Sequence, residues 1–178
     1  MIIYPTDTVY GLGCDIHNHK AVEKVARIKG VRLEKANFSI ICSDLSHLSD
    51  YARHVDNSTF KLMKKLLPGP YTFILDASNK VPRFFTDKKR TIGIRIPNNN
   101  IILEIVRQLE RPILTTSIHD EDEIIEYTTD PELIHEKFQD VVDMVIDGGY
   151  GGTEPSTVID CTGDEPALVR LGAGNIDF

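Results

Sequence analysis

The amino-acid sequence predicts an α/β protein in which one mixed sheet carries flanking helices. Short apolar runs of strand length alternate along the chain with segments whose apolar residues recur at helical spacing. Glycine and proline clusters such as Leu67–Pro70 separate these segments. The 178 residues are 41% hydrophobic, which is enough for one sizeable core, so we expect a single domain over residues 1–178.

The predicted elements follow the chain in order. A strand over 2–5 precedes a helix over 19–29, which Asn18 is expected to cap, and a second strand follows at 38–42. Helices are expected near 44–52 and 57–66, the latter capped by Asp56 and ended by Leu67–Pro70. Further helices are expected near 99–109 and 131–138, with Pro131 at the first helical position. The remaining strands are predicted at 71–75, 91–96, 113–117, 142–147, 157–160 and 167–170.

The segment from Tyr4 to Gly13 is unusually polar for a strand that follows an apolar start. If residues 4–10 stay extended, Thr6, Thr8 and Tyr10 lie on one face of the strand. Gly11 and Gly13 would then permit a turn or the close approach of a ligand. Two interpretations stand side by side: a strand that ends in a glycine turn, and a binding site for a small polar ligand.

Alternation within other strands places further polar groups together. In Thr91–Ile96 the isoleucines take one face and leave Thr91, Gly93 and Arg95 on the other. Arg95 either faces water or pairs its planar guanidinium with a ligand carboxylate. Thr115 and Ser117 likewise share a face, and Ser156 follows the glycine loop 148–152. That loop lacks the Gly-Lys-Ser/Thr of a P-loop, so scattered strand-end and loop groups would have to hold any nucleotide.

Charge and cysteine content bound the class of protein. The formal net charge of −7 argues against a protein whose main task is to hold phosphate backbones. A local basic cluster, formed by Lys61, Lys64 and Lys65 together with the cations between Lys80 and Arg90, is either solvated surface or a contact for nucleic acid. Three cysteines without a C-x-x-C pair indicate reduced thiols. No apolar run is long enough to cross a membrane and no secretion signal is evident, so we expect a cytoplasmic protein.

Seven blocks of sequence, in this order, resemble one known superfamily. They are Tyr4–Gly13, Lys29–Arg32, Leu67–Ile74, Thr91–Pro97, Ile113–Ser117, Pro155–Asp160 and Leu168–Gly172. Together they resemble the threonylcarbamoyl-AMP synthase superfamily of YrdC-like proteins, which includes the YciO-like branch. The resemblance covers almost the whole chain. It implies the YrdC-like fold, a twisted open mixed sheet with flanking helices around a large concave cavity.

The resemblance also implies an activity and a set of site residues. The family reaction joins L-threonine, bicarbonate and ATP into threonylcarbamoyl-AMP, releases pyrophosphate, and supplies a tRNA adenosine modification. We expect Mg²⁺ to arrive with ATP, no metal site of the protein's own, and no tightly bound cofactor. By this resemblance the catalytic residues are Lys29 and Arg32, which would also hold the ATP phosphates; the other nucleotide contacts are Thr91, Ser117 and Arg170; and the threonine contacts are Thr8, Tyr10, Arg95, Thr115 and Ser156.

Departures from the family pattern point to the YciO-like branch. Lys29-Gly-Val-Arg32 carries one residue more than the usual Lys-x-Arg, and Ser117-Ile-His119 replaces Ser-x-Asn. The run from His119 to Glu123 is acidic where a triphosphate would approach, and the helix that usually precedes the first strand of the family is expected to be missing. Two alternatives therefore remain beside the synthase: a protein that binds double-stranded RNA or tRNA without synthase activity, and a nucleotide or adenylate enzyme that acts on another substrate.

Overall fold

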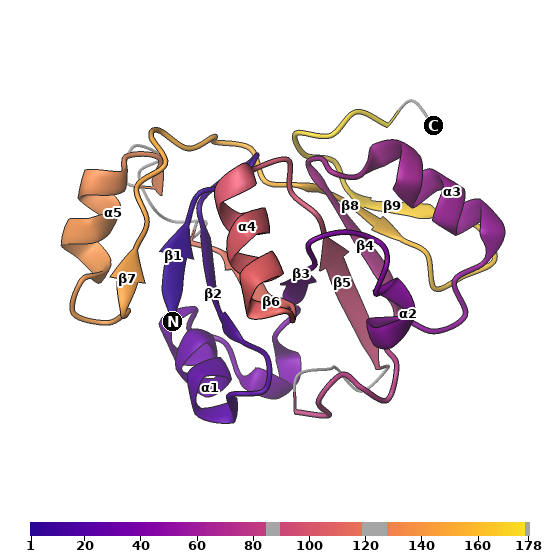
Figure 1. The fold of residues 1–178 in the computed structure, drawn as a ribbon, viewed down its shortest axis with the longest axis horizontal. Coiled ribbons are helices and arrows are strands. Elements are labelled where there is room, and N and C mark those ends of the chain that lie inside the picture. The colour runs from indigo at the N-terminus through magenta and orange to yellow at the C-terminus, as the bar shows by residue number, and fades with distance from the viewer. Residues whose placement is uncertain (85–89, 119–127, 177–178) are drawn as a thin grey trace.

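The protein is described here from a computed structural model, which describes residues 1–84, 90–118 and 128–176. These residues form one nine-stranded mixed sheet with flanking helices (Figure 1). The order across the sheet is β7-β1-β2-β6-β3-β5-β4-β8-β9. The strands are β1 (Ile2–Tyr4), β2 (Gly11–Asp15), β3 (Ser39–Ile41), β4 (Tyr71–Asp76), β5 (Thr91–Arg95), β6 (Ile113–Ser117), β7 (Met144–Val145), β8 (Thr157–Asp160) and β9 (Ala167–Arg170).

Several helices accompany the strands in the described residues. They are α1 (His19–Ile28), the 3₁₀ turn η1 (Leu33–Lys35), α2 (Leu48–Tyr51), α3 (Asn57–Leu66), α4 (Asn100–Leu109) and α5 (Pro131–Phe138). Asn18, Asp56, Asn99 and Asp130 each accept a hydrogen bond from a backbone N–H in the first turn of the helix that follows. Such caps satisfy donors that have no partner within the helix.

Two apolar clusters hold the helices against the sheet. The larger cluster contains Leu12, Ile40 and Ile94 from the strands, and Val22 of α1 packs within it. In the smaller cluster α4 packs on β1, β3 and β6 through residues such as Ile102 and Ile113. Side chains alternate along β6, so Ile113 shares its face of the sheet with the polar Thr115 and Ser117. Helix α4 therefore covers only part of that face, and the polar part remains beside it.

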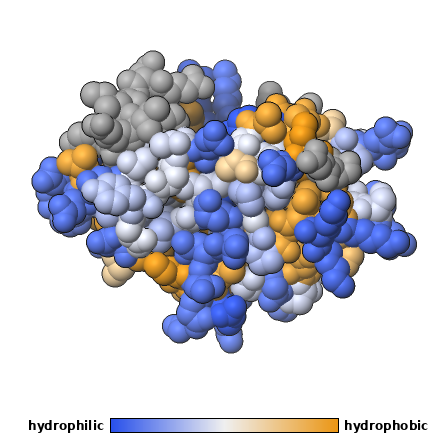
Figure 2. All heavy atoms as spheres, turned by 90° about the horizontal axis from the view of Figure 1, so that it is seen from above, coloured by the Kyte–Doolittle hydropathy of each residue, from blue (hydrophilic) through white to orange (hydrophobic). Residues whose placement is uncertain are grey.

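The last strand lies at an edge of the sheet. β9 pairs with β8 alone among the described strands, and all four of its residues are exposed. Leu168, Val169 and Leu171 are large apolar residues that remain at the surface there. Figure 2 shows hydrophobic surface gathered on the side of the molecule that carries α3, β8 and β9 in Figure 1.

The fold class predicted from the sequence is confirmed, and the elements differ from the prediction in four places. The extended course expected for residues 4–10 is wrong: β1 ends at Tyr4 and a loop leads to β2, which starts at Gly11. β2 itself escaped prediction because its glycines are typical of turns. The elements expected over 44–52 and 142–147 shorten to α2 and β7.

None of the helices in the described part of the chain is both long and apolar enough to span a membrane.

Candidate functional site

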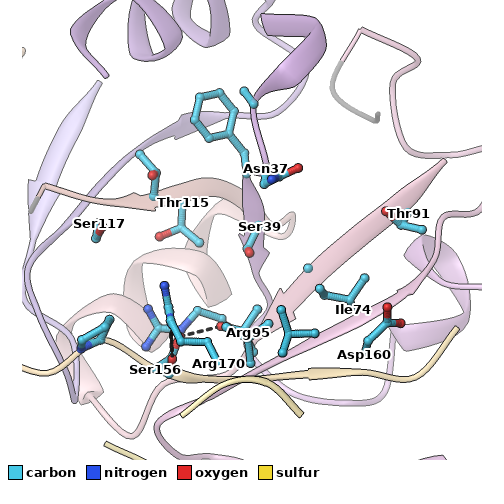
Figure 3. A pocket seen from close by; sticks show the side chains of 18 of the residues that line it. Asn37, Ser39, Ile74, Thr91, Arg95, Thr115, Ser117, Ser156, Asp160 and Arg170 are labelled. Atoms are coloured by element: carbon cyan, nitrogen blue, oxygen red, sulfur yellow. Dashed lines mark hydrogen bonds between the residues drawn. The ribbon is translucent and has the colours of Figure 1, made fainter. Parts of the chain in front are cut away.

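A concave cavity of about 480 Å³ opens on the polar face of the sheet. Strands β3, β4, β5, β6, β8 and β9 all contribute side chains to its wall. This volume lies within the range of small-molecule sites. Figure 3 shows Arg95, Arg170 and Ser156 close together at one end, and Thr91 and Asp160 at the other.

The register of the central strands explains why the cavity floor is polar and open. Ser39 of β3 lies opposite Gly93 of β5 on one side and Thr115 of β6 on the other. A Cβ at position 93 would lie 2.2 Å from the Ser39 hydroxyl oxygen, so any other residue there would displace the Ser39 side chain. Gly93 thus keeps the Ser39 hydroxyl within the cavity wall.

Arg95 is the most constrained polar group of the site. It is 8% exposed, and its Nη2 donates to Asp7 Oδ1 at 3.2 Å and to Thr8 Oγ1 at 3.0 Å. Burial lowers the pKa of the guanidinium below its ordinary value, while the charge of Asp7 opposes that shift. Its Nε is buried and has no hydrogen-bond partner among the described residues. A buried donor without a partner is costly unless a ligand supplies the acceptor.

The loop after β1 fixes the direction of the hydrogen bonds around Thr8. Thr6 Oγ1 donates to the carbonyl of Val9 at 2.7 Å, so its proton is committed there. The 3.1 Å contact between the hydroxyls of Thr6 and Thr8 must then use the proton of Thr8. Thr8 accepts from Arg95 in turn. This fixed chain leaves Thr8 no proton to donate to a ligand.

Tyr4 and Thr115 form a second buried pair at the same end of the cavity. The fully buried hydroxyl of Tyr4 donates to Thr115 Oγ1 at 2.7 Å. Burial raises the pKa of Tyr4 above its ordinary value, so the phenol keeps its proton. A Cβ on Gly11 would lie 2.7 Å from the Tyr4 ring, so the glycine of β2 makes room for this side chain. Thr115 accepts from Tyr4, and its own proton remains to be donated.

Arg170 and Ser156 join the end of the chain to the same site. Arg170 Nη2 donates to the carbonyl oxygen of Ser156 at 2.8 Å, and the hydroxyls of Ser156 and Thr72 lie 2.8 Å apart. Burial lowers the pKa of Arg170, and the charge of Arg170 is among the causes that lower the pKa of Arg95. The two guanidiniums are therefore within electrostatic reach of each other. Cations and hydroxyl donors at one end make an environment for an anion.

The structure brings most of the predicted site residues to one cavity. Its lining includes the six residues Thr91, Arg95, Thr115, Ser117, Ser156 and Arg170. Thr8 does not belong to that lining but contacts Arg95. Tyr10 points elsewhere: its hydroxyl donates to the carbonyl of Gly149 at 2.7 Å and accepts from the N–H of Gly148. Tyr10 thus holds the glycine loop.

The two predicted catalytic cations are placed differently from the other site residues. Lys29 ends helix α1, and Arg32 is an exposed residue just before η1. Neither belongs to the described lining of the cavity. The extra residue in Lys29-Gly-Val-Arg32 is part of the turn between these two elements, in which Gly30 has a φ of 64°. Their role toward ATP stays a prediction.

The structure describes only part of the predicted basic cluster and none of the acidic run 119–123. Lys61, Lys64 and Lys65 belong to α3, and Lys80 forms an ion pair with Asp50. Lys88, Lys89 and the acidic run 119–123 lie outside the described residues. Over residues 1–84, 90–118 and 128–176, no three His, Cys, Asp or Glu side chains gather as metal ligands would.

Three contributing residues were missed from the sequence. Thr72 carries a detectable signal, because Tyr71, Phe73 and Leu75 alternate with it and leave it on the polar face. Tyr4 looked like an ordinary apolar strand residue. Asp7 offered no signal, because its partner Arg95 lies 88 positions away.

The chain belongs to the Sua5/YciO/YrdC family. The model of that family, described as "Telomere recombination", matches residues 1–172. The uncharacterized protein YciO of Escherichia coli K12 is 44% identical over 178 residues, which is 99% of this chain and 84% of that protein. The threonylcarbamoyl-AMP synthase of Pyrococcus abyssi is 33% identical over 177 residues, which is 97% of this chain and 50% of that protein.

Solved structures of these two relatives have the same fold. The crystal structure of E. coli YciO superposes with a TM-score of 0.90 over 99% of this chain and 84% of that one, at 44% identity. The structure of P. abyssi Sua5 complexed with L-threonine gives a TM-score of 0.85 over 96% of this chain and 50% of that one, at 32% identity. The YrdC-like architecture expected from the sequence is therefore confirmed.

Proposed function

We propose that the cavity binds L-threonine together with ATP and that the protein is a threonylcarbamoyl-AMP synthase. The observation that carries this proposal is the buried Nε of Arg95, which has no hydrogen-bond partner among the described residues and belongs to a side chain that lines the cavity. A carboxylate is the acceptor that an arginine edge binds best. Thr115, which accepts from Tyr4, has a proton to donate to the same group.

The remaining lining supports a nucleotide next to the amino acid. Arg170 and Ser117 line the same cavity as Arg95, and Thr91 extends the polar lining to its far end. Arg170 supplies a second cation for a phosphate. Mg²⁺ would accompany the triphosphate as part of the substrate.

The proposed reaction needs positioning and charge stabilisation, and no covalent nucleophile on the protein. The amine of threonine and bicarbonate form a carbamate with loss of water. A carbamate oxygen then attacks the α-phosphorus of ATP, the bond from that phosphorus to the bridging oxygen breaks, and pyrophosphate leaves. Arg95 would hold the threonine carboxylate, and Arg170 would offset charge on the phosphates.

One of the two relatives supports the synthase assignment. The P. abyssi relative is named a threonylcarbamoyl-AMP synthase, and its Sua5 structure was solved with L-threonine. The E. coli relative, which is more similar to this chain, is named an uncharacterized protein.

A second candidate function follows from the position of the two basic residues near α1. Lys29 and Arg32 are absent from the described cavity lining, so the supply of phosphate-binding cations there differs from what the family pattern implies. This favours an enzyme that keeps an adenylate site and acts on another substrate, for example by hydrolysis.

The test is threonine-dependent release of pyrophosphate from ATP in the presence of Mg²⁺ and bicarbonate. We expect release by the wild-type protein, none without threonine, and a loss of at least about a hundredfold in Arg95→Ala, because a charge-assisted contact to the threonine carboxylate is removed. Arg95→Lys serves if the alanine variant does not fold, since it keeps the charge but not the planar edge. The matched control is Arg107→Ala, which removes an exposed arginine of α4 that pairs with Glu104.

Two results would overturn the synthase proposal. One is pyrophosphate release that does not depend on threonine. The other is no release while AMP or ATP still raises the melting temperature, which would instead support the second candidate.

A further inference from the structure

Asp7 holds Arg95 from outside the cavity. Its Oδ1 accepts from Arg95 Nη2 at 3.2 Å, and its Oδ2 accepts from the backbone N–H of Asn98 at 2.9 Å. Only 10% of the Asp7 side chain is exposed, and Asp7 is not part of the cavity lining. One carboxylate thus ties the loop after β1 to both β5 and the turn that precedes α4.

The guanidinium of Arg95 carries five hydrogens, one on Nε and two on each terminal nitrogen. Nη2 carries two, and they are taken by Asp7 and Thr8. These two acceptors fix the rotation of the guanidinium plane about its long axis. Nε carries a single hydrogen that has no partner among the described residues, so it is a buried donor left for a ligand beside the cavity.

We propose that Asp7 is a positioning residue that orients Arg95 so that its Nε edge receives the carboxylate of an amino-acid substrate. The proposal rests on the proposed function only for the identity of that substrate. Asp7 also compensates the positive charge of Arg95. What Arg95 provides to the ligand is therefore a correctly oriented N–H donor more than a net positive charge. This device favours a carboxylate over a neutral group of the same shape, because a charged acceptor makes the stronger hydrogen bond with the oriented Nε–H.

The substitution Asp7→Asn distinguishes the positioning role of the carboxylate from the mere filling of space by the side chain. The amide is isosteric but has one oxygen for two donors, so it can accept from Arg95 or from Asn98 but not from both. Its NH₂ group then faces the other donor. If the amide oxygen stays with Asn98, the guanidinium loses one of its two fixed acceptors; if it stays with Arg95, a neutral acceptor replaces a charged one. The charge of Arg95 itself remains in both cases.

The experiment follows the Nε–Hε signal of Arg95 by NMR and the affinities of two ligands by calorimetry. The signal is identified by its loss in Arg95→Lys. In Asp7→Asn we expect exchange of Hε with water to accelerate by about tenfold or more, and the affinity for L-threonine to fall by a similar factor. The preference for L-threonine over L-threoninamide should shrink toward one, which a general loss of stability would not cause.

The matched control is Asp50→Asn, the same substitution at the exposed ion pair with Lys80. It should change neither the Arg95 signal nor the ligand preference. Asp7→Glu keeps the charge but moves the carboxylate by one methylene, and it carries the test if Asp7→Asn does not fold. An intermediate loss of preference is expected there.

The outcomes distinguish this inference from the proposed function. An unchanged Arg95 signal in both Asp7 variants would overturn the positioning role, as would tighter threonine binding, which would make Asp7 a competing anion. An accelerated exchange in a protein whose wild type binds no threonine would support the positioning role and overturn the threonine assignment.

Discussion

Tyr4 shows how one side chain can serve both the core and the candidate site. Its ring is fully buried in the cluster that α4 covers, and its hydroxyl reaches Thr115 beside the cavity. The ring crosses β2 at a glycine, where any Cβ would clash with it. A residue that packs in the core therefore also fixes the orientation of the Thr115 hydroxyl through a hydrogen bond.

Tyr4→Phe should destabilise the protein by about 1 kcal/mol, because Thr115 loses a buried hydrogen-bond donor. Denaturant unfolding measures this change. Tyr150→Phe is the control, since Tyr150 is 80% exposed and its hydroxyl should contribute nothing measurable. Equal midpoints for the two variants would show that the Tyr4 hydroxyl is not a net stabilising contact.

At the scale of elements, β5 and helix α3 illustrate what local sequence determines. The alternation in β5 placed its isoleucines in the core and left Thr91, Gly93 and Arg95 for the cavity, as predicted. The Asp56 cap of α3 was predicted from its position before the helix and is confirmed. Both features depend on residues a few positions apart, and so the sequence alone could reveal them.

The loop of residues 5–10 shows where that reasoning failed. Its threonines were expected on an extended strand, yet Thr6 bonds to Val9 and closes a turn. Side chains of Thr and Asp often bond to nearby backbone in this way, which competes with strand formation. The contact of this loop with Arg95 joins residues more than 80 positions apart, and no local pattern could indicate it. About half of the site, the strand-borne half, was predictable for this reason.

The Asp56 cap leads to a prediction about acid stability. Hydrogen bonds from Ser58 and Thr59 hold the pKa of Asp56 below its ordinary value of 3.8. A carboxylate with a depressed pKa stabilises the folded state at pH values above 3.8, and this contribution disappears as the pH falls through the lower folded-state pKa.

Thermal melts between pH 2 and 6 measure this dependence. Asp56→Asn, which keeps a capping oxygen but cannot titrate, should show a flatter acid limb than wild type. A parallel decline of both proteins would show that other carboxylates control acid unfolding.

On the scale of the whole molecule, the reactivity of the three cysteine thiols measures how often the native structure unfolds. Cys14 and Cys42 are buried on the core face of the sheet, and burial raises the pKa of each thiol to about 12. Burial also raises the pKa of Cys161, to about 11. At pH 8 a thiol of pKa about 12 is thiolate in roughly one molecule in ten thousand.

All three thiols should therefore react slowly with a disulfide reagent in the native state and rapidly after unfolding. The rate at pH 8, followed with and without denaturant, tests this expectation. Cys161 should react first of the three, because it is the least buried. Fast native labelling of Cys14 or Cys42 would contradict the packing of these strands.

The strand order determines how late in its synthesis the protein can complete its sheet. β4 pairs in parallel with β8, although more than 80 residues separate them, and β8 then pairs with β9. Pairings so distant in sequence form slowly, because the chain must lose the entropy of a long loop before the favourable strand contacts can form. Arg170 lies 75 positions after Arg95 in the sequence. During synthesis on a ribosome, the cavity can therefore be completed only after the segment through Arg170 has emerged, long after Arg95.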